Sequence, residues 1–129
     1  MTSKIIRNLV LVWLYVAPLW VYPTSAIGQA FFKHIDDLPL APGLFEALGD
    51  GVSFESSGIR IVTATARGSV NISAVKRFYR KSLPPLGWSV SHAGTYFRQG
   101  ELLTLRFERM FGLTKMVVRL VPAQTKLPE

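Results

Sequence analysis

The sequence predicts an α+β fold, an antiparallel β-sheet with one amphipathic helix packed on one face, in the chain order β-β-α-β-β-β-β. Apolar and polar residues alternate with a period of two through most of residues 52–122, which is typical of half-buried strands. The stretch that ends at Pro84 instead has the periodicity of an amphipathic helix. Hairpin-length links join the strands everywhere except around the helix, and this arrangement gives an antiparallel sheet covered on one face.

The first thirty residues are predicted to be a secretory signal peptide rather than part of the fold. Lys4 and Arg7 precede an uncharged apolar run of fourteen residues, 9–22, and small and polar residues follow as far as Ala30. A transmembrane helix needs ~20 apolar residues, so the run is short for a membrane anchor, and an uncleaved anchor is the alternative interpretation. Cleavage after Ala26 or Ala30 fits the small-residue pattern, and we favour Ala30.

Residues 31–51 are predicted to form an extended strap that lies on the domain. Pro39 and Pro42 keep the residues before them out of the helical region, and apolar residues lie around these prolines. Residues 45–48 are expected to form a helical turn, which ends at the turn signal Gly49-Asp50-Gly51.

A β-hairpin is predicted to open the domain, which spans 52–122. Residues 52–57 alternate between apolar and polar side chains, and Gly58 turns the chain. Residues 59–67 are rich in β-branched side chains and stop at Gly68, so they are expected to form the second strand.

The helix has one apolar or neutral side and one basic side. The apolar or neutral residues cover an arc of about 140°; they are Val75, Phe78, Tyr79, Ser82 and Leu83. The other side carries Lys76, Arg77, Arg80 and Lys81. Ser69 or Asn71 can cap the N-terminus, and Pro84-Pro85 ends the helix because a proline ring supplies no amide proton.

Four further strands are predicted to complete the sheet, over residues 88–91, 95–98, 101–109 and 114–121. Pro122 ends the last strand, and 123–129 form a C-terminal tail. Leu103, Leu105 and Phe107 are expected to share one face of the strand over 101–109, and Met116, Val118 and Leu120 one face of the last strand. The core is expected to combine the inward faces of the strands with six residues in and after the helix: Val75, Phe78, Tyr79, Leu83, Leu86 and Trp88.

The segment after the helix forms a predicted corner between the two halves of the sheet. Pro84 and Pro85 end the helix, Gly87 permits a backbone conformation that other residues avoid, and Trp88 begins the next strand as a buried anchor. We interpret this corner as a structural device.

The run from Phe78-Tyr79 to Gly87-Trp88, together with Leu38-Pro39, Gly58–Ile61 and Leu120–Pro122, resembles a family of small exported bacterial proteins of unknown function. In that family a Phe-Tyr helix is followed by a Leu-Pro-x-Leu-Gly-Trp corner. The resemblance implies an α+β fold and a place in the bacterial cell envelope, and it brings no activity or ligand with it.

Composition and charge exclude several kinds of site. The chain has no cysteine, so disulfides and thiolate zinc sites are excluded. It carries 15 basic and 8 acidic residues, and removal of Lys4 and Arg7 with the leader leaves 13 basic residues and a net charge of about +5. Such a domain could bind anionic partners, such as lipid head groups, cell-wall polymers or an acidic protein surface. The alternative interpretation is that this modest positive charge only aids solubility. The predicted export, to the periplasm or outside the cell, argues against nucleic acid.

No complete catalytic or metal site is recognisable, and no cofactor is predicted. His34, Asp36 and Asp37 could supply metal ligands or an oriented base, and His92 lies at a predicted hairpin tip. We interpret all four as solvated loop residues, since loops usually carry such side chains at the surface. An enzyme centred on His34 and the two aspartates is therefore disfavoured.

The sequence favours a non-catalytic envelope module that binds a protein partner or an anionic surface. Its candidate binding residues are Lys76, Arg77, Arg80 and Lys81, which have no acidic residue on the helix to pair with. The alternative is a small carrier of an apolar ligand, held between the helix and the sheet. Membrane association is expected if the leader stays uncleaved.

Overall fold

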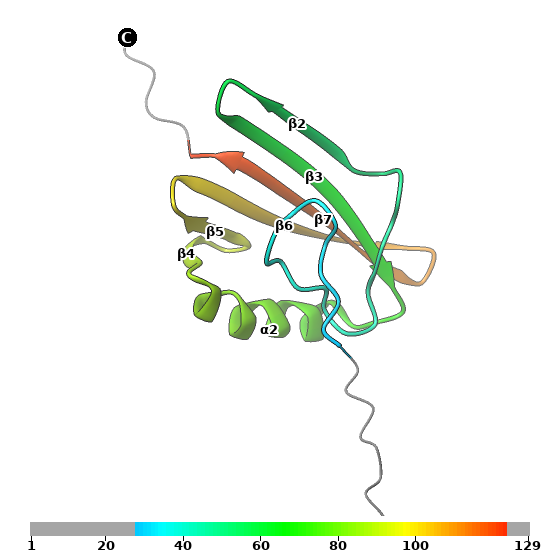
Figure 1. The fold of residues 1–129 in the computed structure, drawn as a ribbon. Coiled ribbons are helices and arrows are strands. Elements are labelled where there is room, and N and C mark those ends of the chain that lie inside the picture. The colour runs from blue at the N-terminus through cyan, green and yellow to red at the C-terminus, as the bar shows by residue number, and fades with distance from the viewer. Residues whose placement is uncertain (1–27, 124–129) are drawn as a thin grey trace, which may run out of the picture.

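The computed structural model describes residues 28–123 of the 129-residue chain. Most of the predicted signal peptide, and the predicted tail after Ala123, lie outside the described residues. Within the described range, a seven-stranded antiparallel sheet carries one α-helix on one face, which confirms the α+β prediction (Figure 1). No helix between residues 28 and 123 is long and apolar enough to cross a membrane.

The spatial order of the strands is β1-β3-β7-β6-β5-β4, with β2 also paired to β3. Short β1 and β2 share one side of β3, and β4 forms the opposite edge of the sheet. A register shift between Val90 and His92 makes that edge irregular. Along the chain the elements are β1 (Phe45–Glu46), β2 (Val52–Ser56), β3 (Ile59–Gly68), α2 (Ile72–Ser82), a short 3-10 helix η2 (Pro84–Leu86), β4 (Ser89–His92), β5 (Thr95–Arg98), β6 (Glu101–Met110) and β7 (Leu113–Pro122).

The helical turn predicted over residues 45–48 is wrong, because the first two of these residues form strand β1. Phe45 pairs with Arg67 and Glu46 with Ala66, at the end of β3 that β2 does not reach. The backbone groups of β3 need partners there, and non-local pairing satisfies them. This tertiary demand overrides the weak local preference for a turn.

The ends of α2 are set by the residues that the sequence pointed to. Of the two candidate caps, Asn71 is the one used, because its side chain accepts a hydrogen bond from the amide of Ser73 at 2.8 Å. The helix ends at Ser82, before Pro84. Gly87 then adopts a left-handed conformation with φ of 89°, and the buried Trp88 immediately precedes β4.

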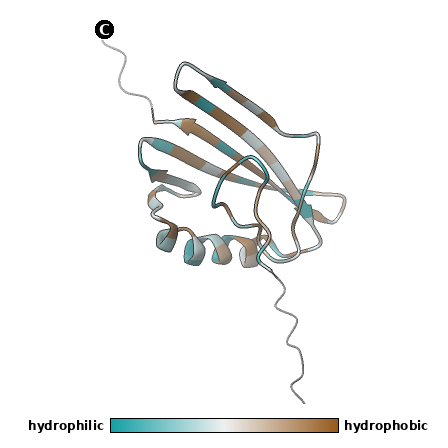
Figure 2. Cartoon of the chain, viewed as in Figure 1, coloured by the Kyte–Doolittle hydropathy of each residue, from teal (hydrophilic) through white to brown (hydrophobic). Residues whose placement is uncertain are grey.

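The core lies between the sheet and its two covers, α2 and the strap. The helix buries Val75, Tyr79 and, just past its end, Leu83, whereas Phe78 and Leu86 are only partly buried at its margin. The predicted inward residues of β6 and β7 all face this side, and all are buried except Phe107, which is half-buried. In Figure 2, hydrophobic residues, coloured brown, recur along the ribbons of these strands.

The strap contributes more to the core than a surface segment would. A bridge between Phe31 and Pro39 folds it back on itself. Six of its apolar side chains are buried in the same cluster as those of the helix and sheet, and they are Phe32, Ile35, Leu38, Leu40, Ala41 and Leu44. The sheet is therefore covered jointly by a helix and by an irregular segment.

Tyr79 joins the helix to the strap. Its buried hydroxyl donates a hydrogen bond to the carbonyl of Pro39 at 2.8 Å and accepts one from the amide of Ala41 at 3.3 Å. An irregular segment that enters a core needs partners for its backbone groups, and this phenol supplies two of them. Burial raises the pKa of Tyr79 well above its usual value of 10.0, although the hydrogen bond from Ala41 acts in the opposite direction.

Replacing Tyr79 with phenylalanine should lower the free energy of unfolding by about 1–3 kcal/mol, because it leaves two buried backbone groups without a partner. Urea denaturation followed by circular dichroism measures this change. The matched control is Tyr96→Phe, since no hydrogen bond of the Tyr96 hydroxyl is found among the described residues. Equal destabilisation by both substitutions would contradict the proposed link.

The raised pKa of Tyr79 predicts a loss of stability at alkaline pH. A neutral phenol whose folded pKa exceeds its unfolded value stabilises the fold fully below the unfolded pKa, and this contribution is lost as the pH rises above it. The stability advantage of the native chain over Tyr79→Phe should stay constant up to about pH 9 and shrink above about pH 10. Paired urea titrations across this range measure it, and an advantage that grows with pH would contradict it.

Candidate ligand-binding groove

A groove of about 460 Å³ opens between α2 and strands β4 to β6. This volume falls in the range of roughly 300–1,000 Å³ that is usual for small-molecule sites. Helix residues line one wall, and strand and turn residues form the floor and the other wall. The lining residues are Lys76, Tyr79, Arg80, Val90, Ala93, Gly94, Tyr96, Leu105 and Phe107.

Strand alternation places the apolar floor. Leu105 and Phe107 lie two residues apart on β6 and therefore share its core face. Tyr96 reaches the same face from β5, because it pairs with Leu103. The amide of Leu105 donates to the carbonyl of Gly94 at 2.8 Å, which fixes the β4–β5 turn beside the floor.

Two cations stand on the helix side of this floor. Lys76 and Arg80 are one helical turn apart, and both line the groove. The Lys76 Nζ lies 5.5 Å from the centre of the Phe107 ring, within reach of a cation–π contact. Among residues 28–123, neither cation forms an ion pair with a carboxylate.

Arg80 also acts electrostatically on Tyr96. Burial raises the pKa of the Tyr96 phenol, and the positive charge of Arg80 lowers it again in part. Both side chains line the groove. An anionic group bound here would meet a positive field over an apolar surface.

The four basic residues predicted as one docking face are divided by the fold into two pairs. Lys76 and Arg80 line the groove over β4 to β6. Arg77 and Lys81 instead line a second hollow of about 300 Å³ on the strap side of the helix, where Pro42 and Val70 also lie. All four side chains are exposed. The helix thus presents one cation pair to each of two different concave surfaces.

The predicted corner is held by a residue that sequence reasoning missed. The guanidinium of Arg98 lies 4.3 Å from the centre of the Trp88 ring and donates to the carbonyl of Leu86 at 3.0 Å. Pro84 and Pro85 are exposed, whereas Trp88 is buried beneath this arginine. The pairing of β5 with β4 brings Arg98 to the corner, and no local sequence signal reports that contact.

The histidine and aspartate cluster of the strap has structural partners. The carbonyl of His34 accepts a hydrogen bond from Arg60 at 2.8 Å, and the same arginine lies 3.7 Å from the carboxylate of Asp36. Asp37 is exposed. His92 lies beside the hydroxyl of Ser91 at 3.0 Å. In the described part of the chain, no group of three or more histidine and acidic side chains could hold a metal ion.

Sequence reasoning identified half of the groove. It placed Leu105 and Phe107 on one face of their strand and assigned Lys76 and Arg80 to the helix surface, but it did not identify Val90 or Tyr96. These two residues reach the groove only through the pairing of β4, β5 and β6, and the sequence does not report which strands pair.

No family model, curated protein or solved structure matches this chain. The resemblance to small exported bacterial proteins therefore stays a prediction.

Replacing Arg80 with glutamine should raise the pKa of Tyr96 further, because the substitution removes the positive charge that lowers it. Tyrosinate absorbance as a function of pH measures the shift, and the Tyr96→Phe variant assigns the titration to this residue. Arg77→Gln removes the same charge from the other side of the helix and should leave Tyr96 unchanged. Equal shifts in both variants would mean that Arg80 does not face this groove.

Proposed function

We propose that this chain is a non-catalytic binding module of the bacterial cell envelope, which holds an amphipathic anion in the groove between α2 and strands β4 to β6. The ligand class is an apolar body, such as a single acyl chain, that ends in a carboxylate or phosphate. One observation carries the proposal: the groove combines an apolar floor with two cations that have no carboxylate partner among the described residues.

The two parts of the groove suit the two parts of such a ligand. The half-buried Phe107 and the exposed Val90 offer apolar surface to the hydrocarbon, over the largely buried Leu105 and Tyr96. Arg80 offers a planar donor set that can bind a carboxylate or phosphate through two hydrogen bonds. Lys76 adds a flexible ammonium one turn away. The lining residues include no carboxylate and no histidine, the groups that most often act in acid–base catalysis, which supports a role in binding.

The predicted leader and the basic charge of the mature domain favour this ligand class, because anionic amphiphiles are constituents of cell envelopes. The sequence left two hypotheses open, a carrier of an apolar ligand and a helix that binds anions. A ligand held in the groove would use both the apolar floor and the helix cations. In the competing version, Lys76, Arg77, Arg80 and Lys81 act together as one basic docking face. The division of these residues between two hollows favours the groove.

Two double variants separate these versions, since each removes two positive charges from the same helix. Lys76→Gln/Arg80→Gln removes the groove pair, and Arg77→Gln/Lys81→Gln is the matched control. Titration calorimetry with palmitate below its critical micelle concentration should show affinity weakened at least about tenfold in the groove variant, as expected for the loss of a charge-assisted hydrogen bond. The control should stay within about twofold of the native chain.

Three compounds that each carry only one part of such a ligand test the ligand class. Hexadecanol keeps the chain without the charge, and acetate and inorganic phosphate keep the charge without the chain. All three should bind much more weakly than palmitate, since each lacks one of the two recognised parts. Equal binding of hexadecanol would remove the role of the cations, and equal binding of acetate would remove that of the floor. Equal losses in both double variants would favour a single basic docking face.

A further inference from the structure

The hairpin between β6 and β7 ends in an unusually apolar tip, formed by Met110, Phe111, Gly112 and Leu113. Met110 pairs with Leu113, and Phe111-Gly112 forms the two-residue turn. The Phe111 side chain is 96% exposed, and those of Met110 and Leu113 are 41% and 40% exposed. These three side chains gather at one point with nothing among the described residues to cover them.

Two other hairpins in the chain use the same turn geometry with polar residues. Ser57-Gly58 joins β2 to β3, and Gln99-Gly100 joins β5 to β6. In all three turns both residues have positive φ: 48° and 78°, 48° and 80°, and 52° and 76° for Phe111-Gly112. Such turns prefer asparagine or glycine at the first position, and a bulky residue is disfavoured there. The backbone therefore gives no reason for phenylalanine at the tip.

The apolar tip and the two polar turns lie at opposite ends of the sheet (Figure 1). Since β3 and β6 are each antiparallel to β7, both begin at the end that carries Ser57-Gly58 and Gln99-Gly100. The tip lies where β6 ends and β7 begins. Phe45, which is 75% exposed, pairs with Arg67 at this same end of the sheet.

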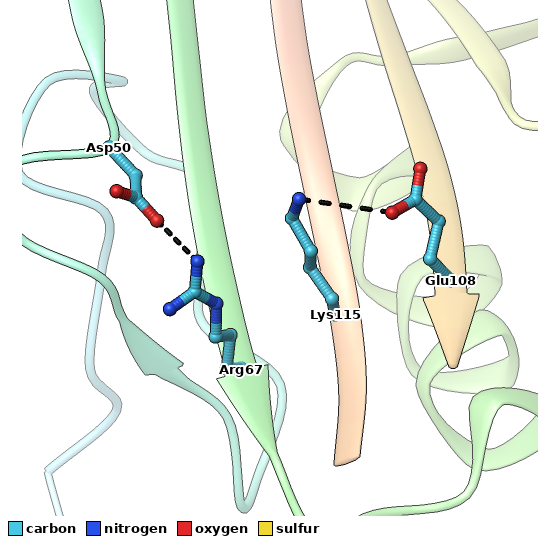
Figure 3. Close-up of polar contacts among 4 residues, drawn as sticks. All are labelled: Asp50, Arg67, Glu108 and Lys115. Carbon is cyan, nitrogen blue, oxygen red and sulfur yellow. Dashed lines mark hydrogen bonds and ion pairs between the residues drawn. The ribbon is translucent and has the colours of Figure 1, made fainter. Parts of the chain in front are cut away.

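Charged residues surround the base of the tip. Arg67 pairs with Asp50, and Lys115 lies 3.8 Å from the carboxylate of Glu108, so these four groups neutralise one another (Figure 3). Arg109 donates to the carbonyl of Gly112 at 3.4 Å and has no acidic partner among the described residues. The base of the tip is therefore close to neutral, with one free positive charge next to the apolar side chains.

We propose that the β6–β7 tip inserts into the interface of an anionic phospholipid bilayer, with Phe111 foremost and Arg109 at the level of the phosphates. Aromatic and aliphatic side chains beside a cation suit that interface, where the rings meet acyl chains and the cation meets negative head groups. A second copy of this chain fits less well, because a stable dimer buries about 800 Å² per partner and three side chains at a hairpin tip supply far less. The inference does not depend on the ligand of the groove.

The absence of cysteine from the chain allows a single-site probe of the tip. In the full chain, Phe111→Cys labelled with an environment-sensitive fluorophore should brighten and shift to the blue on vesicles of phosphatidylcholine mixed with phosphatidylglycerol. The response should be weaker on phosphatidylcholine alone, and brominated lipid should quench the label. The same label at Gln99→Cys reports on an equivalent turn at the far end and should not respond. A label at position 111 that responds like the one at 99 would overturn the proposal.

A second variant separates binding from folding. Phe111→Asn places a preferred residue in the turn, so urea denaturation should show stability equal to or above that of the native chain. Its partition onto anionic vesicles should fall roughly 10-fold or more, as expected when one phenylalanine side chain is no longer buried in the bilayer. Phe54→Thr removes an exposed phenylalanine from β2 and should leave the partition unchanged.

The variant and the native chain carry the same N-terminus, so any binding of the leader to the vesicles contributes equally to both measurements. Equal partition of Phe111→Asn and the native chain would overturn the insertion. A label at position 111 that responds to higher protein concentration without vesicles would assign the tip to contacts between copies of the chain instead.

Discussion

The core face of the sheet is covered by two unrelated segments, and the buried phenol of Tyr79 is where they meet. The 11 residues of α2 span about 16 Å, whereas the 10 residues of β6 or β7 extend over about 33 Å. The helix is therefore too short to shield the strands, and the strap has to complete the cover. An irregular segment can enter a core only if its backbone groups find partners. With no cysteine in the chain, non-covalent contacts of this kind hold the cover in place.

The same shortage of cover explains the groove. Helix and strap together bury the core face over β3 and β7, while part of the surface of β4 to β6 next to the helix stays open. The residues there are apolar because side chains alternate along a strand, so its core-facing positions stay apolar even where neither helix nor strap covers them. Lys76 and Arg80 reach this opening because their helix runs beside it. The candidate site is thus a place where the cover of the sheet ends.

Periodicity in the sequence predicted the strands β2 to β7, the helix, its possible caps and the corner at Gly87, because each depends on local backbone preferences or on the alternation of side chains. Strand β1 was missed because its two residues are strands only through pairing with Arg67 and Ala66. The division of the basic residues was missed for a related reason: a helical projection gives the arc that the cations occupy, but not the surfaces on either side of the helix. The corner contact of Arg98 with Trp88 also depends on pairing between strands, which no short stretch of sequence encodes.

The irregular edges of the sheet have a consequence for how copies of the protein meet at high concentration. The register shift between Val90 and His92 interrupts the row of amides and carbonyls along β4. At the other edge, two short strands, β1 and β2, pair with different parts of β3. A long, flat edge strand is what templates the addition of strands from other chains. Neither edge offers one, so growth into the continuous cross-β stacks of amyloid is obstructed.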